Sequence, residues 1–247
     1  MESIQGVRTK LVLVSGSHGA IRVPLAQSLN YTPRLTERTI NEFDNLEAAM
    51  VVTTFDGVDI TFDYLDSDSN LVDASFADAD PSGDVIIDDP SNYKMVHVFA
   101  NMKGLETGKI FASILAKNCR AKGSPYTEPV KEEARITRDL SGTNVLKVKG
   151  GAILYSRILT AVPDVSVYDQ AIPPNAYADL NMAVSTPFVA TLAQSGEDLG
   201  GGKFYLWCLK NGVEVTTGFT VTATTFTAAD TPVDTDVWEL YTVYLDV

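Results

Sequence analysis

Alternation of polar and apolar residues between positions 50 and 65 constrains this chain more than any other feature. The segment reads MVVTTFDGVDITFDYL, and in its second half acids and threonine alternate with isoleucine, phenylalanine and tyrosine. Successive side chains of a strand point to opposite faces of a sheet, so the pattern predicts one acidic face and one packed face. Asp56-Gly57 near the middle indicates either a hairpin turn or a bulge in a single long strand.

The rest of the chain carries the same signal and predicts a mainly β protein. Runs rich in Thr, Val, Ile, Tyr and Phe recur between turn residues. Pro33 lacks the amide hydrogen that a central strand needs, so it restricts its own strand to an edge or a bulge. Asn211-Gly212 predicts a tight hairpin turn. Strands are expected at residues 7–14, 21–25, 29–40, 94–101, 134–140, 145–159, 177–185, 188–194, 203–209, 213–217, 219–226 and 237–246.

One segment predicts a helix instead. Between Thr107 and Lys122, apolar residues recur at three- and four-residue spacing, which places them on one helical face. Thr107 suits the N-cap, while Gly123 and Pro125 would end the helix. We therefore expect one helix flanking the sheet, with its apolar stripe formed by Ile110, Phe111, Ile114, Leu115 and Cys119.

A change in composition predicts two domains. Residues 163–175 contain three prolines and are expected to be a linker. After Val165 the chain has only 2 basic residues against 10 acidic ones, is rich in threonine and shows no helical pattern. The sequence therefore predicts a first domain over 1–162 and a small Ig-like β-sandwich over 176–247, with Trp207 and Cys208 in its core.

Charge and motifs exclude several classes of function. The net charge is −13, so most of the surface would repel nucleic acid. No phosphate-binding loop or nucleophile elbow occurs, and the Gly200-Gly201-Gly202 run lacks the strand-to-helix context of a phosphate site. His18 lies in an expected turn and His97 in an expected strand, where a hydrogen-bonded structural histidine is the simpler reading. We expect no enzymatic activity and no cofactor.

A long acidic segment admits two interpretations. From Asp56 to Asp89 there are eleven acids and no basic residue, and residues 66–90 are expected to form a loop. Part of the loop follows the spacing of a calcium-binding loop, although its last position is Asp rather than Glu and neither flank reads as a helix. The alternatives are a solvated acidic loop and a calcium site formed by Asp78, Asp80, Ser82, Asp84 and Asp89.

Three further features leave alternatives open. Cys119 and Cys208 are either two buried free thiols or one long-range disulfide. Lys147, Lys149 and Arg157 either form salt bridges to Asp59 and Asp63 or occupy a solvated strand face. The apolar run Leu11–Val14 is too short for a signal peptide or a membrane span, so we expect synthesis and retention in the cytoplasm.

The order of expected elements resembles a known family. The residues that carry this likeness are TERTINEFDNLEAAMVVTTFDGVDITFDYL, VHVFANMKGLETGKIFASILAKNCRAKG and PVKEEARITRDLSGTNVLKVKGGAILYSRIL. N-terminal strands, a long strand pair, a strand, one helix and a final strand pair resemble the major tail tube protein of tailed phages and related contractile injection systems. The likeness covers residues 5–160, and an appended β-sandwich is a feature of some tube proteins.

That resemblance implies a structural role in a virion, built from the chain itself. It implies stacked homo-hexameric rings whose inner strands form one barrel, with other tail proteins at the tube ends and DNA passing without specific binding. Asp59, Thr61 and Asp63 are then candidates for the lumen wall. The acidic segment becomes a candidate inter-ring loop that carries Asp66, Asp68, Asp73, Asp78, Asp80, Asp84, Asp88 and Asp89. We expect basic residues of a neighbouring subunit, Arg34, Arg38, Lys147 or Lys149, to neutralise its charge.

Two other classes share these features. A capsid decoration or other virion surface protein would also be acidic and rich in strands, but would need no open sheet for a neighbour to complete. A carbohydrate-binding β-sandwich would present Trp207 or Trp238 on a flat face, whereas both lie in alternating strands that suit a core equally well.

Overall fold

A computed structural model describes most of the expected strands. It covers residues 7–15, 19–23, 26–41, 48–65, 94–104, 109–123, 126–127, 135–159, 177–181, 188–191, 198–199, 201–229 and 236–245. The chain divides into two compact units, one formed by Lys10–Phe99 and Leu115–Leu146, the other by Met1–Thr9, Ala100–Ile114 and Lys147–Val247. All regular elements of the described residues are strands, which confirms the mainly β fold class.

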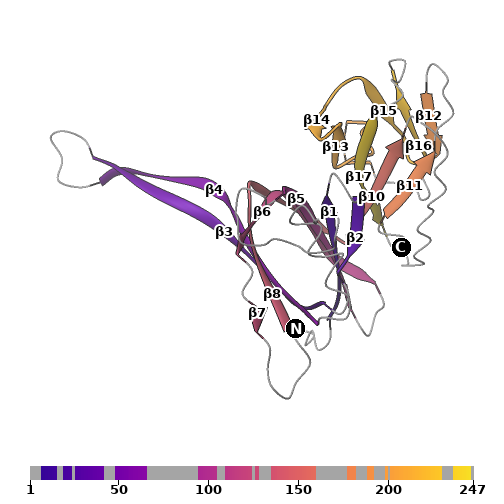
Figure 1. The fold of residues 1–247 in the computed structure, drawn as a ribbon. Helices are drawn as coiled ribbons and strands as arrows, with labels where there is room; N and C mark the ends of the chain where they lie inside the picture. Colours follow the sequence, from indigo (N-terminus) through magenta and orange to yellow (C-terminus); the bar gives the residue numbers. More distant parts are fainter. Residues whose placement is uncertain are drawn as a thin grey trace. The chain divides into compact units, whose positions relative to one another are not determined.

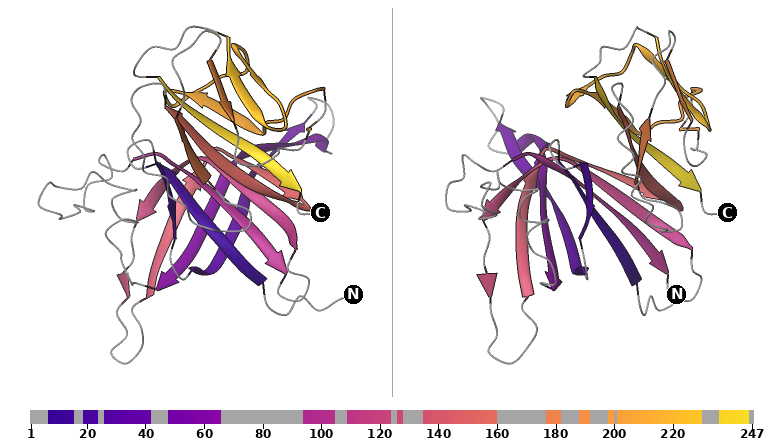
Figure 2. Two further views of the ribbon diagram at one scale, coloured as in Figure 1. Left: turned by 90° about the vertical axis from the view of Figure 1, so that its right-hand side faces the viewer. Right: turned by 45° about the vertical axis from the view of Figure 1, so that its right-hand side comes forward.

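The unit that contains Lys10–Phe99 holds most of one sheet, whose described registers are antiparallel (Figures 1 and 2). The strand order is β2-β1-β5-β6-β8-β4-β3, with β7 beside β8 and β9 beside β6. Strand β3 therefore lies at an edge, one of the two positions that Pro33 allows. The strands are β1 (Val7–Ser15), β2 (Gly19–Arg22), β3 (Ala26–Asn41), β4 (Ala48–Leu65), β5 (Val96–Gly104), β6 (Ile110–Gly123), β7 (Tyr126–Thr127), β8 (Arg135–Gly142) and β9 (Asn144–Lys149).

Strand β4 has the two faces that its alternation predicts. Val58, Ile60, Phe62 and Tyr64 are at most 1% exposed, and the residues between them are partly exposed. Phe62 and Tyr64 also contact each other, with ring centroids 6.1 Å apart. At about 25 cal/mol per Å² of buried apolar surface, four such side chains on one strand hold its packed face firmly to the core.

The Asp56-Gly57 signal marks a bulge and not a hairpin turn. β4 is one continuous strand of 18 residues, and its register against β3 shifts between Arg34 and Leu35. Arg34 lies opposite Gly57 and Leu35 opposite Phe55, so Asp56 is the extra residue. Gly57 has φ of +130°, a conformation that side chains with a Cβ rarely adopt.

The second unit contains two further sheets. One has the order β11-β10-β17-β13-β14 and the other the order β12-β16-β15. Strand β10 pairs with β17 over nine residue pairs, from Gly151–Leu245 to Leu159–Val237. The strands are β10 (Gly151–Leu159), β11 (Tyr177–Asn181), β12 (Phe188–Thr191), β13 (Trp207–Lys210), β14 (Val213–Glu214), β15 (Phe219–Val221), β16 (Thr225–Ala228) and β17 (Val237–Leu245).

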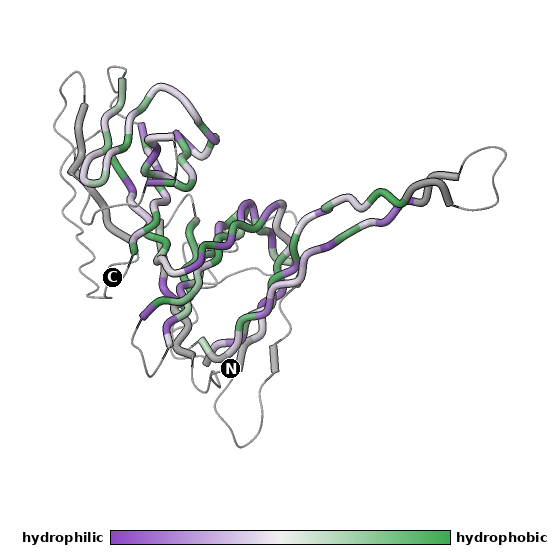
Figure 3. The backbone as a smooth tube through the Cα atoms, turned by 180° about the vertical axis from the view of Figure 1, so that it is seen from behind, coloured by the Kyte–Doolittle hydropathy of each residue, from purple (hydrophilic) through white to green (hydrophobic). Residues whose placement is uncertain are grey.

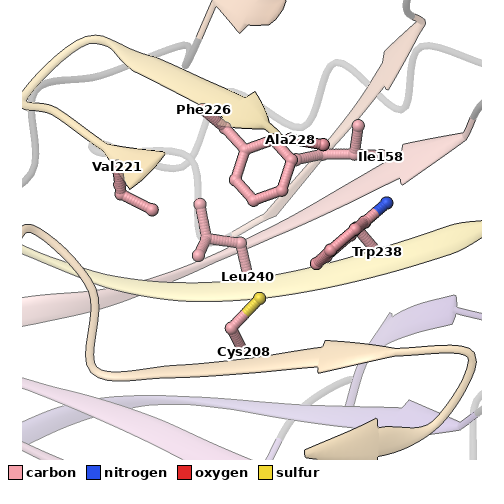
Figure 4. Packing of buried hydrophobic residues seen from close by; sticks show 7 residues of the cluster. All are labelled: Ile158, Cys208, Val221, Phe226, Ala228, Trp238 and Leu240. Atoms are coloured by element: carbon pink, nitrogen blue, oxygen red, sulfur yellow. The ribbon is translucent and has the colours of Figure 1, made fainter. Parts of the chain in front are cut away.

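A hydrophobic cluster that contains Phe226 and Trp238 forms a core in this unit (Figure 4). Phe226 and Trp238 lie with ring centroids 5.2 Å apart, and Phe219 stacks on Phe226 at 5.8 Å. Such pairs add about 1 kcal/mol each to the burial of their surface. Trp207 is 3% and Cys208 0% exposed, so their predicted core positions are confirmed.

The helix predicted over 107–122 is wrong. Residues Ile110–Gly123 form strand β6. Ala112 to Ala116 are all buried, so this part of the strand is covered on both faces and needs no polar alternation. A continuous apolar run contains every spacing, including three and four, and it therefore imitates an amphipathic helix. Phe111, placed on the expected apolar stripe, is 41% exposed.

Other local predictions are confirmed in detail. The Asn211-Gly212 turn joins β13 to β14, with φ of 52° and 77°, the two positive values that a type I′ turn needs.

The linker expected at 163–175 lies outside the described residues, and the domain boundary there stays a prediction. Strand β10 precedes it in the chain and pairs along its full length with β17, which follows it. Within the described residues, no helix is long and apolar enough to span a membrane.

Candidate functional site

A polar face extends over β3, β4 and β8 opposite their packed face. Strand register places three residues of each strand side by side in a three-by-three array. Three of the nine are carboxylates, the rest are hydroxyl or amide side chains, and none is Lys or Arg. We call this array the polar face; it consists of Ser28, Asn30 and Thr32 on β3, Asp59, Thr61 and Asp63 on β4, and Thr137, Asp139 and Ser141 on β8.

Hydrogen bonds across the strands hold the polar face in place. Asp63 accepts from the hydroxyl of Ser28 at 2.8 Å and from that of Thr137 at 2.7 Å. Thr61 donates to Asp139 at 2.6 Å. Bonds to charged acceptors are stronger than bonds between neutral groups, so both carboxylates have defined orientations before any partner arrives.

Two cations contact Asp59 at one end of the polar face. The Nζ atom of Lys122 on β6 lies 2.6 Å from its Oδ1, and Nε of Arg34 on β3 lies 3.4 Å from the same oxygen. Asp59 therefore pairs with these residues, where the sequence left Lys147, Lys149 and Arg157 as its possible partners. A hollow of about 230 Å³ opens beside the Asp59–Lys122 ion pair. It is lined by Asp59, Ile60, Thr61, Lys122, Asp139 and Leu140.

The residues predicted for the lumen wall come together, and others were missed. Asp59, Thr61 and Asp63 share one face of β4, as the alternation predicts. Asp139 and Thr137 escaped the sequence reasoning, although alternation in RITRDLSG signals them. The calcium-loop candidates and the inter-ring loop acids, Asp66 to Asp89, lie outside the described residues.

A two-stranded arm is the second feature of this unit. Strand β8 pairs with β4 only from Val58 to Leu65, and among the described residues the preceding part of β4 pairs with β3 alone. We call residues 34–41 and 48–57 the arm; Figure 1 shows it extending from the sheet. Leu35, Val51 and Phe55 are 60%, 57% and 43% exposed. Figure 3 shows apolar residues along this ribbon.

Exposed apolar residues gather on one face of the arm. Leu35 is paired with Phe55, and Val51 lies on the same face of β4 as Phe55 because the two are four residues apart. Isolated two-stranded ribbons are at best marginally stable in water. An apolar face on such a ribbon is typical of a surface that a partner covers.

His97 and both cysteines have structural environments, whereas His18 lies outside the described residues. Nδ1 of His97 on β5 accepts a hydrogen bond from the backbone N–H of Asn118 at 3.0 Å. Burial, with a smaller effect of Lys117, lowers the pKa of His97 to about 4, so the ring is neutral at pH 7. Burial raises the pKa of the Cys119 and Cys208 thiols to about 12, and both are free. These thiols are inert at neutral pH.

A buried carboxyl lies in the second unit. The hydroxyl of Tyr155 donates to Oε1 of Glu239 at 2.8 Å, and Arg157 is its neighbour in register on β10. Burial is the main cause that raises the pKa of Glu239. Tyr155, Tyr241 and Trp207 form an aromatic row beside it, with successive ring centroids 5.2 Å apart. Among the described residues, no three His, Cys, Asp or Glu side chains gather as metal ligands.

Comparison with known proteins finds similarity at the level of structure alone. No family model matches the sequence, and no curated protein matches it. The SPP1 tail tube is 12% identical, with a TM-score of 0.37 over 57% of this chain and 76% of the tube protein. Hcp1 from Salmonella typhimurium is 12% identical, with a TM-score of 0.36 over 57% and 87%. The PVC sheath-tube complex of an extracellular contractile injection system matches at 9% identity and a TM-score of 0.37 over 57% and 88%.

These three structures are at most 12% identical to this chain. Their TM-scores are all below 0.5, so we base the function on this chain's own residues.

Proposed function

We propose that this chain is a structural subunit of a virion tail tube, in which homo-hexameric rings stack around a lumen that conducts the genome. Other tail proteins would bind the two ends of the tube. The role is one of assembly and passage and not of catalysis. It explains together the acidity of the chain, the polar face and the arm.

The arm is the observation that carries the proposal. Its apolar face leaves Leu35, Val51 and Phe55 in water on a ribbon that has little stability by itself. A second copy of this chain is the simplest occupant, because repeated copies cover every arm in turn and the same contact serves the whole tube. The acidic segment 66–89 is proposed as a further contact between rings.

The polar face suits a lumen wall. Its nine side chains include three carboxylates and no cation, which disfavours phosphate binding over most of the face; at one end Arg34 and Lys122 pair with Asp59 and offset its charge. Its hydrogen bonds run between neighbouring strands, and its opposite face is buried. Strand β3 ends the sheet, and pairing with a neighbour's sheet would remove that free edge.

Variants of the arm test this function. Leu35→Ser with Phe55→Ser removes apolar surface that is already exposed, so the subunit should fold with an unchanged unfolding midpoint. Assembly, followed by light scattering and negative-stain microscopy, should be lost. Thr53→Ser, another exposed position on the arm, is the matched control and should assemble like the wild type.

Three outcomes would contradict the proposal. Wild-type protein that stays monomeric at high concentration under all salt conditions would do so. A protein that binds capsids as a monomer and never forms rings would also contradict it. Tubes formed equally well by the double serine variant would show that the arm is not the contact.

A further inference from the structure

The root of the arm is the place where its direction is decided. The last residue pair between β4 and β8 is Val58–Gly142, and the β3–β4 bulge at Asp56 lies immediately beyond it. Bulges bend a strand and increase its twist. The path of the arm relative to the polar face therefore depends on how tightly the conformation of Asp56 and Gly57 is held.

Arg34 contacts both sides of this bulge. Its terminal nitrogen Nη2 donates to the backbone carbonyl of Asp56 at 3.3 Å, and its Nε lies 3.4 Å from the carboxylate of Asp59. Asp56 belongs to the arm and Asp59 to the polar face, so a single planar group connects the two. The Asp59 carboxylate also contacts Lys122, which ties the connection to strand β6.

Close packing around Gly57 leaves no room for a side chain at this point of the bulge. A Cβ added at Gly57 would lie 2.5 Å from the carbonyl oxygen of Gly142 and 2.6 Å from Nη2 of Arg34. A Cβ at Gly142 would lie 3.0 Å from the sulfur of Cys119. The guanidinium thus lies directly against a glycine that itself lies against the end of β8. Thr36 donates to the Asp56 carboxylate and holds the bulged residue from the β3 side.

We propose that Arg34 is a positioning residue, whose guanidinium holds the Asp56–Gly57 bulge in one conformation and so fixes the direction in which the arm leaves the sheet. Its effect on assembly rests on the proposed function, because a fixed arm meets its partner without losing conformational freedom. If the arm samples several directions, the apparent affinity for its partner falls in proportion to the fraction of subunits whose arm has the binding-competent direction.

Lysine cannot replace Arg34 in this role. A guanidinium is rigid and planar, so Arg34 donates to the Asp56 carbonyl through one nitrogen while another lies in the ion pair with Asp59, whereas an ammonium is a single point of charge on a flexible stem. The ion pair itself is about 40% exposed, with side-chain values of 41% for Arg34 and 36% for Asp59. Exposed pairs contribute little to folding, so Arg34→Lys should leave the unfolding midpoint nearly unchanged while it releases the arm.

Double spin labelling of the free subunit tests the positioning directly. Labels at Thr53→Cys on the arm and Arg120→Cys on β6 report the direction of the arm, because both positions are exposed. The native thiols Cys119 and Cys208 are buried and should not react. The distance distribution is measured by pulsed electron resonance below the assembly concentration, for wild type, Arg34→Lys and the control Arg38→Lys, an exposed arginine on the same strand.

We expect one narrow distance distribution for wild type and Arg38→Lys, and a clearly broader one for Arg34→Lys with the same unfolding midpoint. The concentration needed for assembly should rise about tenfold in Arg34→Lys, if one arm in ten keeps the correct direction. An equally narrow distribution in Arg34→Lys would overturn the proposal, as would a broad distribution in the wild type. A third outcome separates the two proposals. If the distance distribution broadens in Arg34→Lys but the wild type itself forms no tubes, the positioning role is upheld and the proposed function is refuted.

Discussion

Replacement of His97 by asparagine should remove a specific loss of stability in acid. Nδ1 of His97 accepts the N–H of Asn118, which has a positive φ of 51°, so the bond holds an irregular point of β6. Asparagine presents an amide oxygen close to the position of Nδ1 and has no proton to gain. The variant therefore keeps the acceptor and loses the titration, at the cost of a smaller buried side chain.

The structure sets both the sign and the size of this effect. Burial, followed by Lys117, lowers the pKa of His97 from 6.5 to about 4. The unfolded chain therefore binds a proton more readily than the folded one between these values. The contribution of His97 is fully present above pH 6.5, falls as the pH falls, and is lost near pH 4. Since one pKa unit corresponds to about 1.4 kcal/mol, the loss is at most about 3.5 kcal/mol.

Urea unfolding between pH 7 and pH 4 measures it, at concentrations where the subunit is free. Many carboxylates also titrate in this range, so the informative quantity is the free energy of unfolding of wild type minus that of His97→Asn. This difference should decrease steadily as the pH is lowered from 6.5 to 4. Parallel curves for the two proteins would refute the reasoning, since His97 would then titrate alike in the folded and unfolded chains.

Two further substitutions test the arm root and the second unit. Gly57→Ala should destabilise the fold by more than about 2 kcal/mol, because the strain of an unfavourable backbone conformation adds to a clash with Gly142. Gly212 also has positive φ but has open space around it, so Gly212→Ala should cost only about 1 kcal/mol. Equal urea midpoints for the two variants would contradict this. Glu239→Gln should raise the unfolding midpoint at pH 8, because the raised pKa of Glu239 means that its contribution is present in acid and lost as the pH rises. The amide can still accept from Tyr155, so a midpoint gain that persists unchanged at pH 4 would argue against a charge effect.

Local sequence was enough where a short segment determines its own geometry. Alternation in β4 predicted which residues are buried, because a strand repeats every two residues whatever its partners are. Asn211-Gly212 predicted its turn because few residues adopt positive φ in succession. His97 was correctly read as a hydrogen-bonded structural residue, since it lies inside a strand.

Non-local pairing was beyond the reach of those patterns. The helix expected over 107–122 is strand β6, because spacing along the chain does not show that neighbours cover both faces of a segment. Asp56-Gly57 left a turn and a bulge as alternatives, and the register against β3 decided for the bulge. The partners of Asp59 also depend on register, since Arg34 and Lys122 approach it from strands 25 and 63 residues away.

The sequence by itself determined that this is an acidic, mainly β protein, that Asp59, Thr61 and Asp63 share a face, and that a tight turn joins the strands around Asn211. These properties follow from side-chain periodicity, charge and backbone preference, all of which act over a few residues. Only the tertiary structure decided that β8 ends at Gly142 and leaves the arm with β3 as its described partner, and that Arg34 meets both Asp56 and Asp59 at its root. The physical reason is that strand pairing depends on segments far apart in the chain, whose packing selects one register among many that the same alternation permits.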